Sequence, residues 1–341
     1  MRFLALFLAA CGGLISCGGS IDKPDVSRVD VGTVHIERFD TAFFNIDSND
    51  VIAGLRRLDQ EYPFFTPDFV GNILGAEEPL TDTSRLAFAA TRQFLVSYHG
   101  VSDSLKAKYA RLDWLEKELQ NGFRFVKYYF PKYKLPQKVV AFIGPFDGPG
   151  VAITSFALGI GLQSYAGKNF PLYLTGKGQD LYPQYVSRRF EPEYITTNCI
   201  NAMAEDIFPD SSDNRPLIEQ MIIKGRYLWL TGKLLPDLPD SIRTGYAKAQ
   251  LDWCAGNEAA VWNFFLQGVD LYTEDPDITK NYIGEGPKTL GMPDAAPGNI
   301  GAWVGWQIVK KYAAAHTELS PAQVMTMPVR SLFEEAKYKP K

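Results

Sequence analysis

A short uncharged segment at the N-terminus, followed by a cysteine, constrains this chain more than any other feature. Arg2 precedes the apolar run from Phe3 to Ala10, and Leu14-Ile15-Ser16 stands directly before Cys17. One positive charge, a short apolar core and small residues are the layout of a secretory signal, and this segment is too short to span a bilayer as a helix. We therefore expect residues 1–16 to be removed and to contribute nothing to the folded domain.

Cys17 is the predicted lipid attachment site. Leu14 and Ser16 fit the bacterial lipobox, which has an aliphatic residue three positions before the cysteine and a small residue directly before it. Cys11 fits the same pattern and stays an alternative, although cleavage there leaves an apolar core at the short end of what export signals use. Each acyl methylene buried in a membrane contributes about 0.8 kcal/mol, so several chains, palmitate among them, would anchor the protein stably.

The rest of the chain predicts one globular domain on a tether. Residues 17–30 are expected to be the lipidated cysteine and a polar spacer, and residues 31–341 a single domain without repeats or low-complexity linkers. That part has no run of about 18 uncharged apolar residues that could form a second membrane anchor. We expect the domain to face the periplasm. Residues 18–23 lack a dense acidic block, which favours this location while leaving surface display open.

Hydrophobic spacing predicts a helix-rich α+β domain with a small central sheet. Alternation predicts a strand at 31–39, and the segments 139–143 and 151–162, separated by a Gly- and Pro-rich turn, predict paired strands. Apolar residues at three-to-four spacing predict helices elsewhere. These helices span 49–60, 83–98, 103–130, 182–190, 197–207, 214–231, 246–255, 258–266 and 301–312.

Charge and cysteine content limit the classes of partner. The net charge is −4 and basic residues are interspersed with acidic ones, which argues against nucleic acid because phosphate binding needs a clustered basic face. The expected partners are a membrane, through the lipid anchor, and envelope proteins. Cys199 and Cys254 remain after the anchor; an oxidising compartment permits a disulfide between them, and two separately buried thiols are the alternative.

Known catalytic and metal-binding motifs are missing from the sequence. His35, His99 and His316 are isolated, and no HExxH, CxxC or phosphate-loop spacing occurs, so we predict no metal, no cofactor and no catalytic residue. His99 and His316 are expected at helix C-termini, where a cation is favoured.

Several strings, in the order in which they occur, resemble the GldB gliding motility lipoprotein family of Bacteroidetes. The resemblance implies a cell-envelope lipoprotein needed for surface gliding in gliding species, a process linked to type IX secretion, and it implies no enzymatic activity. The strings include Val34-His35-Ile36-Glu37-Arg38-Phe39-Asp40, Tyr62-Pro63-Phe64-Phe65, Tyr128-Tyr129-Phe130-Pro131-Lys132-Tyr133, Tyr182-Pro183-Gln184-Tyr185-Val186, Pro297-Gly298-Asn299-Ile300-Gly301 and Trp303-Val304-Gly305-Trp306.

A fainter resemblance links the order of elements to zincin-like metallopeptidases, in which an edge strand precedes a helix with HExxH and a second helix supplies an acidic ligand. On that alignment Gln184, Arg188, Arg189 and Lys224 stand where ligands are expected. None of these side chains offers the imidazole, thiolate or carboxylate that zinc requires. The likeness therefore implies a degenerate zincin-like fold, a pseudoenzyme. Its cleft could still bind an acidic ligand or peptide through Arg188 and Arg189, but the sequence favours plain solvation at the surface as the role of these arginines.

The leading interpretation is a non-catalytic envelope lipoprotein that acts through protein contacts in the motility or secretion machinery. The alternative is an exported hydrolase, peptidase-like or glycan-acting, with an unrecognised site. Buried acids or histidines that converge on a cleft would favour the hydrolase.

Overall fold

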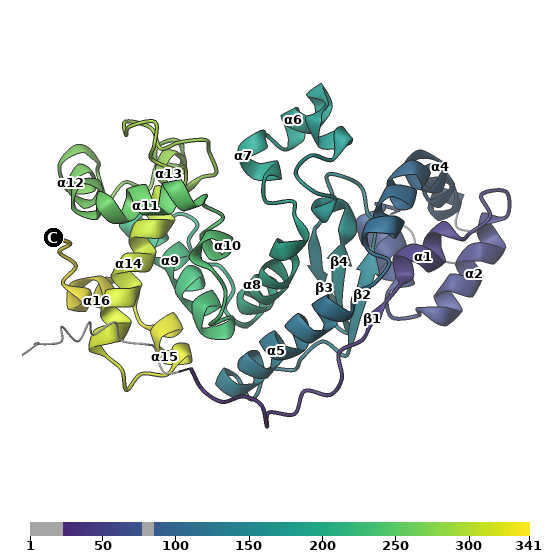
Figure 1. Cartoon of the computed structure of the whole chain (residues 1–341), viewed down its shortest axis with the longest axis horizontal. Helices are drawn as coiled ribbons and strands as arrows, with labels where there is room; N and C mark the ends of the chain where they lie inside the picture. The colour runs from purple at the N-terminus through teal and green to yellow at the C-terminus, as the bar shows by residue number, and fades with distance from the viewer. Residues whose placement is uncertain (1–22, 77–84) are drawn as a thin grey trace, which may run out of the picture.

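The computed structural model describes residues 23–76 and 85–341, so the predicted signal, Cys17 and the first part of the spacer lie outside the described residues. The predicted helix-rich α+β class is confirmed, because helices surround one small mixed sheet (Figure 1). The strands are β1 (Ile36–Glu37), β2 (Lys138–Phe142), β3 (Val151–Ile153) and β4 (Ala157–Gly161).

The sheet has the strand order β1-β2-β4-β3, in which β3 is an edge strand antiparallel to β4 and the other neighbours are parallel. The predicted pairing of 139–143 with 151–162 is confirmed, because β2 lies beside β4, but the segment 151–162 forms two strands and not one. The Thr154 side chain accepts a hydrogen bond from the Ala157 N–H (3.0 Å) and turns the chain there. The hairpin is therefore β3–β4, and β4 lies parallel to β2 with Val139 opposite Leu158.

Strand β2 is buried on both faces, which explains its uninterrupted apolar sequence. Val139 and Ala141 face the core shared with the C-terminal helices, whereas Val140 and Phe142 face a second, phenylalanine-rich core. On β4, a Cβ at Gly159 would lie 3.0 Å from the Phe142 ring and 3.2 Å from the Phe65 ring. This glycine is therefore needed for close packing of the second core against the sheet.

The second core lies between the sheet and the N-terminal helices. Asp50 caps α2 by accepting a hydrogen bond from the Ala53 N–H (3.3 Å), close to the predicted start of a helix at residue 49. The predicted strand at 31–39 is only the two residues of β1, because α1 already begins at Phe39 and buries the Phe39 side chain. These elements are α1 (Phe39–Phe44), α2 (Val51–Glu61), α3 (Thr66–Asp68), the π-helical turn η1 (Phe69–Ile73) and α4 (Arg85–Lys108).

Helix α4 continues through the position where the sequence predicts a break. The predicted gap between helices at 99–102 is wrong. Gly100 costs the helix only about 1 kcal/mol. The buried Leu95, Val101 and Leu105 offset that cost, because they keep one face of α4 packed on both sides of the glycine. The break falls at Tyr109, whose buried hydroxyl donates to the Tyr165 carbonyl (2.7 Å). Helix α5 (Asp113–Tyr129) follows, and it packs with α8 (Ile195–Ile207) on the other face of the sheet.

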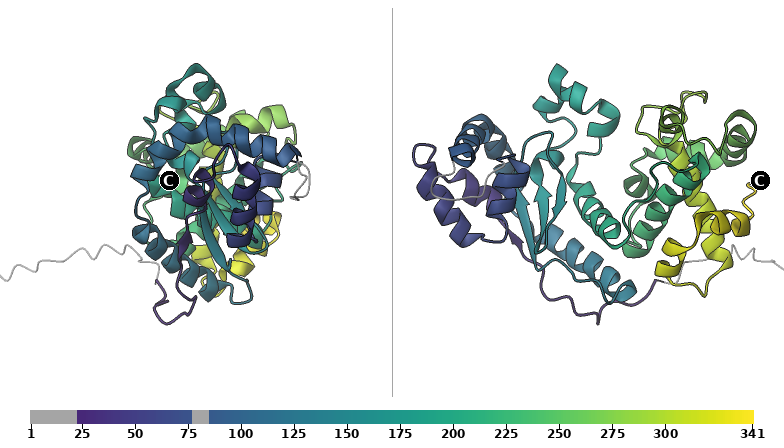
Figure 2. Two further views of the ribbon diagram at one scale, coloured as in Figure 1. Left: turned by 90° about the vertical axis from the view of Figure 1, so that its right-hand side faces the viewer. Right: turned by 180° about the vertical axis from the view of Figure 1, so that it is seen from behind.

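Between β4 and α8 the chain forms an arm of short helical turns that projects from the sheet (Figures 1 and 2). The predicted helix at 182–190 is reduced to one turn, because Pro183 precedes it and Arg188 closes it. The arm contains η2 (Leu162–Tyr165), η3 (Pro171–Leu174), α6 (Gly176–Leu181), α7 (Gln184–Ser187) and η4 (Pro192–Tyr194).

The C-terminal region is built on α9 (Leu217–Leu234) and α14 (Ile300–Ala315), which cross at Gly225 and Gly305. A Cβ at Gly305 would lie 1.8 Å from the Met221 carbonyl oxygen, so the two backbones touch directly. Shorter helices surround this pair. They are α10 (Asp240–Thr244), α11 (Lys248–Gly256), α12 (Glu258–Gly268), α13 (Pro276–Ile283), α15 (Pro321–Thr326) and α16 (Val329–Ala336).

The described part of the expected spacer, from Lys23 onward, is packed against the domain. Val26 is buried in the main core, and the Gln120 side chain on α5 donates to the Gly32 carbonyl (3.1 Å). Lys23 pairs with Asp237, beyond the end of α9. This segment runs along the side of the molecule opposite α6 (Figure 1).

Among the helices of the described chain, none combines the length and the apolar character needed to cross a membrane.

Candidate functional site

Three adjoining cavities follow α8 from the edge of the sheet to the crossing of α9 and α14. They measure about 320, 300 and 150 Å³, and we call them together the α8 groove. The first and second share Phe190 and Asn198, and the second and third share Asn201 and Thr244. The groove therefore touches the arm, α8, α10 and the start of α14.

The lining of the groove is mainly polar at its centre, more apolar at the sheet end and mixed at the far end. The sheet end is lined by Gly148, Gly150, Val151, Ser164, Tyr165, Tyr182, Phe190 and Asn198. The centre is lined by Arg189, Phe190, Tyr194, Thr197, Asn198, Asn201, Ile242, Arg243, Thr244 and Gly245. The far end is lined by Asn201, Glu205, Asp210, Lys224, Tyr227, Leu228, Thr244, Tyr246, Asn299, Ala302 and Trp303.

Polar atoms without a partner gather at this groove. Thr197 Oγ1 and Arg243 Nε, at the centre, and Asn299 Oδ1, at the far end, are buried and have no hydrogen-bond partner within the described residues. Leaving a buried donor or acceptor unpaired costs about 1 to 3 kcal/mol, so such atoms are usually satisfied in a folded protein. Such atoms also occur away from the groove, for example at Thr91, Arg124 and Tyr312, but three at one groove make it the first place to look for a binding site.

The two asparagines of α8 are held by neighbouring elements. The Asn198 amide donates to the Tyr165 hydroxyl (2.9 Å), beside β4. The Asn201 side chain hydrogen-bonds the Thr231 hydroxyl on α9 (2.6 Å). Both side chains are fixed before any ligand arrives, which lowers the entropic cost of recognition.

Two of the predicted cleft residues, Arg188 and Arg189, join the arm to the C-terminal region. Arg188 donates to the Gly245 carbonyl (2.9 Å) and to the Gln250 side chain (3.1 Å). Arg189 forms a bidentate pair with Glu285, with N–O distances of 3.1 and 3.0 Å. Burial, followed by the nearby Arg189 charge, lowers the pKa of Arg188. Arg189 also lines the groove, whereas the main role of Arg188 is to hold the arm.

The other two predicted residues lie apart from each other. Lys224 on α9 lines the far end of the groove and pairs with Asp210. Burial raises the pKa of Asp210, but hydrogen bonds from Lys224 and Ser212 outweigh it and lower the pKa overall. Gln184 begins α7 on the arm and is not among the lining residues. The structure thus brings Arg189 and Lys224 to one groove and leaves Gln184 outside.

The three histidines lie outside the groove. His35 is 2.9 Å from Glu116, and His99 is 3.1 Å from Asp103. His99 lies inside α4, so the prediction that it ends a helix is wrong, whereas His316 does follow the last turn of α14. Within residues 23–76 and 85–341, no group of three or more His, Cys, Asp and Glu side chains could hold a metal ion.

Cys199 and Cys254 are both free and buried, so the open alternative of a disulfide between them is not formed in this structure. Burial raises the pKa of the Cys199 thiol, and it raises the pKa of Cys254 to about 12. Both thiols therefore stay protonated and behave as small apolar side chains.

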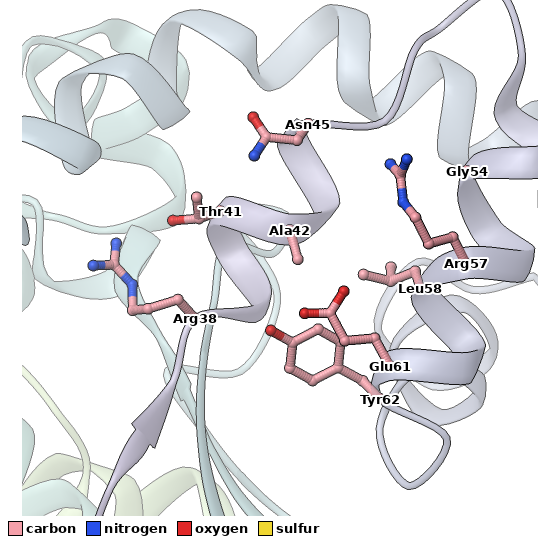
Figure 3. A pocket seen from close by; sticks show the side chains of 9 residues that line it. All are labelled: Arg38, Thr41, Ala42, Asn45, Gly54, Arg57, Leu58, Glu61 and Tyr62. Atoms are coloured by element: carbon pink, nitrogen blue, oxygen red, sulfur yellow. The ribbon is translucent and has the colours of Figure 1, made fainter.

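A larger cavity of about 530 Å³ lies between α1 and α2. Glu61 and Arg57 of α2, with Tyr62 directly after it, line one side, and Thr41 of α1, with Asn45 directly after it, lines the other (Figure 3). One of its arginines is neutralised. Arg38 pairs with the buried Asp40 through N–O distances of 2.8 and 2.7 Å, and that bond raises the pKa of Arg38. Of the nine residues drawn there, all in the described chain, none has a buried side-chain polar atom without a partner. The α8 groove is therefore the stronger candidate.

Sequence reasoning missed Thr197, Asn198 and Asn201, because it assigned the candidate helix to residues 182–190. The helix that packs against β3 and β4 is α8. One signal was available, since Thr196, Thr197 and Asn198 place three consecutive polar residues in the first turn of the helix. The opposite side of the groove comes from α9 and α10, which are distant from these residues in sequence.

Comparison with known families gives one match. The profile of the family described as gliding motility protein GldB matches residues 20–340, a span that includes every element of the α8 groove. No curated protein and no solved structure gives a significant match. The resemblance noted in the sequence is thereby confirmed, whereas the likeness to zincins is untested and stays a prediction.

Proposed function

The chain belongs to the GldB gliding motility lipoprotein family, and we propose that it is a non-catalytic envelope protein that acts through contacts with other envelope proteins. The observation that carries this proposal is the arm beside the α8 groove. Leu172, Leu174 and Leu181 expose 40%, 55% and 54% of their surface there. Exposed apolar side chains grouped beside a polar groove are typical of protein interaction sites.

The residue types on α8 support a non-catalytic role. The HExxH motif of zincins places its two histidines four residues apart and its glutamate directly after the first. If α8 occupies the position of that helix, Thr197, Asn198 and Asn201 stand at this spacing. Hydroxyl and amide groups are poor zinc ligands and cannot replace the glutamate as a base, which favours a pseudoenzyme.

Anchoring through Cys17 is part of the proposal. The family match begins at residue 20, and the first described contacts of the domain begin at Lys23, so both follow this cysteine closely. The residues between Cys17 and Lys23 reach at most about 20 Å when extended, which holds the domain close to the membrane. Cys17→Ala should abolish labelling by a fatty-acid analogue, while Cys11→Ala, the control, should keep it. Labelling that survives Cys17→Ala would remove this assignment.

Site-specific photo-crosslinking in the native envelope tests the protein-contact role. A photoreactive phenylalanine analogue replaces Leu181 on the arm, and Val96 on α4, which is 67% exposed, serves as the matched control. We expect Leu181 to capture a discrete envelope protein, identified by mass spectrometry, and Val96 to capture none. Failure at Leu181, together with a hydrolytic turnover by the purified protein, would favour the alternative below.

One observation favours the alternative, an exported hydrolase. Burial raises the pKa of Glu205, which lines the far end of the groove with Asp210 and Lys224. A carboxyl group with a raised pKa is a candidate general acid. For a hydrolase of this kind, Glu205→Gln should remove turnover of peptide or glycan substrates, and Glu193→Gln, outside the groove, should not.

A further inference from the structure

The arm and the N-terminal segment meet the sheet at opposite edges. Strands β1, β2 and β4 are parallel, so all three begin at one edge of the sheet and end at the other. The segment from Lys23 leads into the beginning of β1 at Ile36, whereas the arm starts at Leu162, directly after the end of β4. Two further views show the same separation, with the arm and this segment at opposite extremes of the molecule (Figure 2).

The N-terminal segment is fixed to the domain from its first described residue. Lys23 pairs with Asp237 beyond the end of α9, and Val26 is only 6% exposed and belongs to the main core. Only residues 18–22 stand between this fixed point and Cys17. The tether that the proposed lipid anchor leaves to the domain is therefore these five residues.

This tether is short compared with the domain. It spans at most about 20 Å when fully extended. A compact domain of about 320 residues is roughly 50 Å across. Because the tether is shorter than half of this width, the domain can tilt on the membrane but cannot turn over. The side that carries the N-terminal segment therefore stays close to the membrane, and the arm stays on the far side.

Hydrogen bonds hold the arm in its projecting position. The Gly167 N–H donates to the Phe190 carbonyl (2.8 Å) and closes the base of the arm. The bidentate pair of Arg189 with Glu285 adds a second attachment, to the C-terminal region on the other side of the α8 groove. With both attachments formed, the arm does not fold back toward the N-terminal segment.

The outer part of the arm exposes aliphatic side chains. Leu172 and Leu174 lie on η3 and Leu181 lies on α6, and these two elements contact each other. Exposed side chains of this kind are buried either in the surface of a membrane or against another protein. The short tether keeps the arm out of reach of the membrane that holds Cys17, and this favours the protein.

We propose that the arm faces away from the membrane that holds Cys17, and that its leucines bind the aqueous domain of a partner protein. The contact lies at roughly the width of this domain from that membrane. This inference rests on the proposed function, because it takes the anchor at Cys17 as its premise. It deepens that function by excluding the lipid surface and the membrane-embedded part of a protein in the same bilayer as partners of the arm.

Photo-crosslinking to lipid tests the orientation. The full-length lipoprotein is placed in vesicles of phosphatidylethanolamine and phosphatidylglycerol that contain a tagged phospholipid. The photoreactive phenylalanine analogue replaces Leu181 or, as the matched control, the exposed Arg28 of the N-terminal segment. We expect at least about tenfold more tagged lipid on the Arg28 variant, because roughly the width of the domain separates the two sites. Equal tagging at the two sites would overturn the orientation and identify the lipid surface as the partner of the arm.

A longer tether provides the second test. A Gly-Ser segment inserted after Ser20 that adds about 40 Å of reach lets the domain turn over, so tagging at Leu181 should rise toward the level at Arg28. Unchanged tagging would show that the tether does not hold the arm away, and this would overturn the inference.

Flotation with the vesicles separates this inference from the proposed function. A protein that floats but tags lipid equally at both sites keeps its anchor and loses only the orientation. A protein that does not float lacks the anchor, which removes the assignment of Cys17 and the orientation together. Capture of an envelope protein from Leu181, at a peptide that mass spectrometry assigns to an aqueous domain, would support the proposed partner, whereas a peptide from a membrane-spanning segment would overturn it.

Discussion

The phenylalanine-rich core and the α9–α14 pair stabilise the same domain by opposite means. In the first, large rings fill space: Phe39 meets the rings of Phe65 and Phe69 at centroid distances of 4.9 Å each. In the second, the crossing point has no side chains, because Gly225 on α9 and Gly305 on α14 let the two helix backbones touch. A core of rings can adjust by rotating side chains, whereas a contact between backbones has no such freedom.

The groove depends on the more rigid of the two regions. Asn299 begins α14, with a left-handed backbone (φ 57°), and the Tyr246 hydroxyl donates to the preceding Gly298 carbonyl (2.9 Å). The Thr231 hydroxyl, which positions Asn201, lies on α9. Any shift of α14 against α9 therefore moves the far end of the groove, while changes in the phenylalanine-rich core leave it in place.

The largest expected effect comes from Gly305→Ala. A Cβ placed 1.8 Å from the Met221 carbonyl oxygen forces the helices apart, and we expect a loss of more than about 4 kcal/mol in the free energy of unfolding. Gly100→Ala is the control, since a Cβ there meets nothing within 4 Å in α4 and should stabilise by about 0.5 to 1 kcal/mol. Urea unfolding measures both. Similar stability in the two variants would contradict the backbone contact at the crossing.

Phe39→Ala should have the next largest effect. Its ring is fully buried, and removal leaves a cavity that the neighbouring rings fill only in part, at a cost of about 3 to 4 kcal/mol. The arm beside the α8 groove should survive, so the photo-crosslink formed from Leu181 at temperatures below the Tm should not change. Tyr272→Ala, at an aromatic residue that is 67% exposed, should cost less than about 0.5 kcal/mol. A loss of that crosslink in Phe39→Ala would break the distinction between the two regions.

The sequence predicted elements with strong periodicity and misplaced those set by distant contacts. Helices α2, α8 and α9 begin close to their predicted positions because caps and apolar stripes are local signals. The sequence paired 139–143 with 151–162 correctly, but it did not show that 151–162 divides into two strands or that β4 runs parallel to β2, since an apolar run does not reveal strand direction. The candidate site was only partly predictable: Arg189 and Lys224 reach the groove, but Asn201 acquires its role only through α9 and α10.

Alkaline pH should destabilise both regions, and this is the smallest of the expected effects. Burial raises the pKa of Tyr62, at the edge of the phenylalanine-rich core, and of Tyr227, on α9, to about 12 each. The ordinary value is about 10, so the folded state favours the neutral phenol. That stabilisation is fully present below pH 10 and is lost as the pH rises through about 12. The loss in free energy of unfolding is roughly 1 kcal/mol for each tyrosine after allowance for solvent screening. Replacing that tyrosine by phenylalanine should remove its share of the alkaline loss.

The two tyrosine variants should differ at neutral pH. Tyr227 donates a hydrogen bond to the Phe208 carbonyl (2.5 Å), so Tyr227→Phe should lose about 1 kcal/mol there. Tyr62 shares its hydrogen bond with the exposed side chain of its neighbour Glu61. Tyr62→Phe should therefore lose less free energy of unfolding at neutral pH than Tyr227→Phe. Urea unfolding at about pH 7, 9 and 11 measures both effects. If the stability of Tyr62→Phe falls between pH 9 and 11 as steeply as that of the unmodified protein, burial of the phenol does not limit alkaline stability in this region. That result would contradict the inference that the folded state keeps the Tyr62 phenol neutral at this edge of the core.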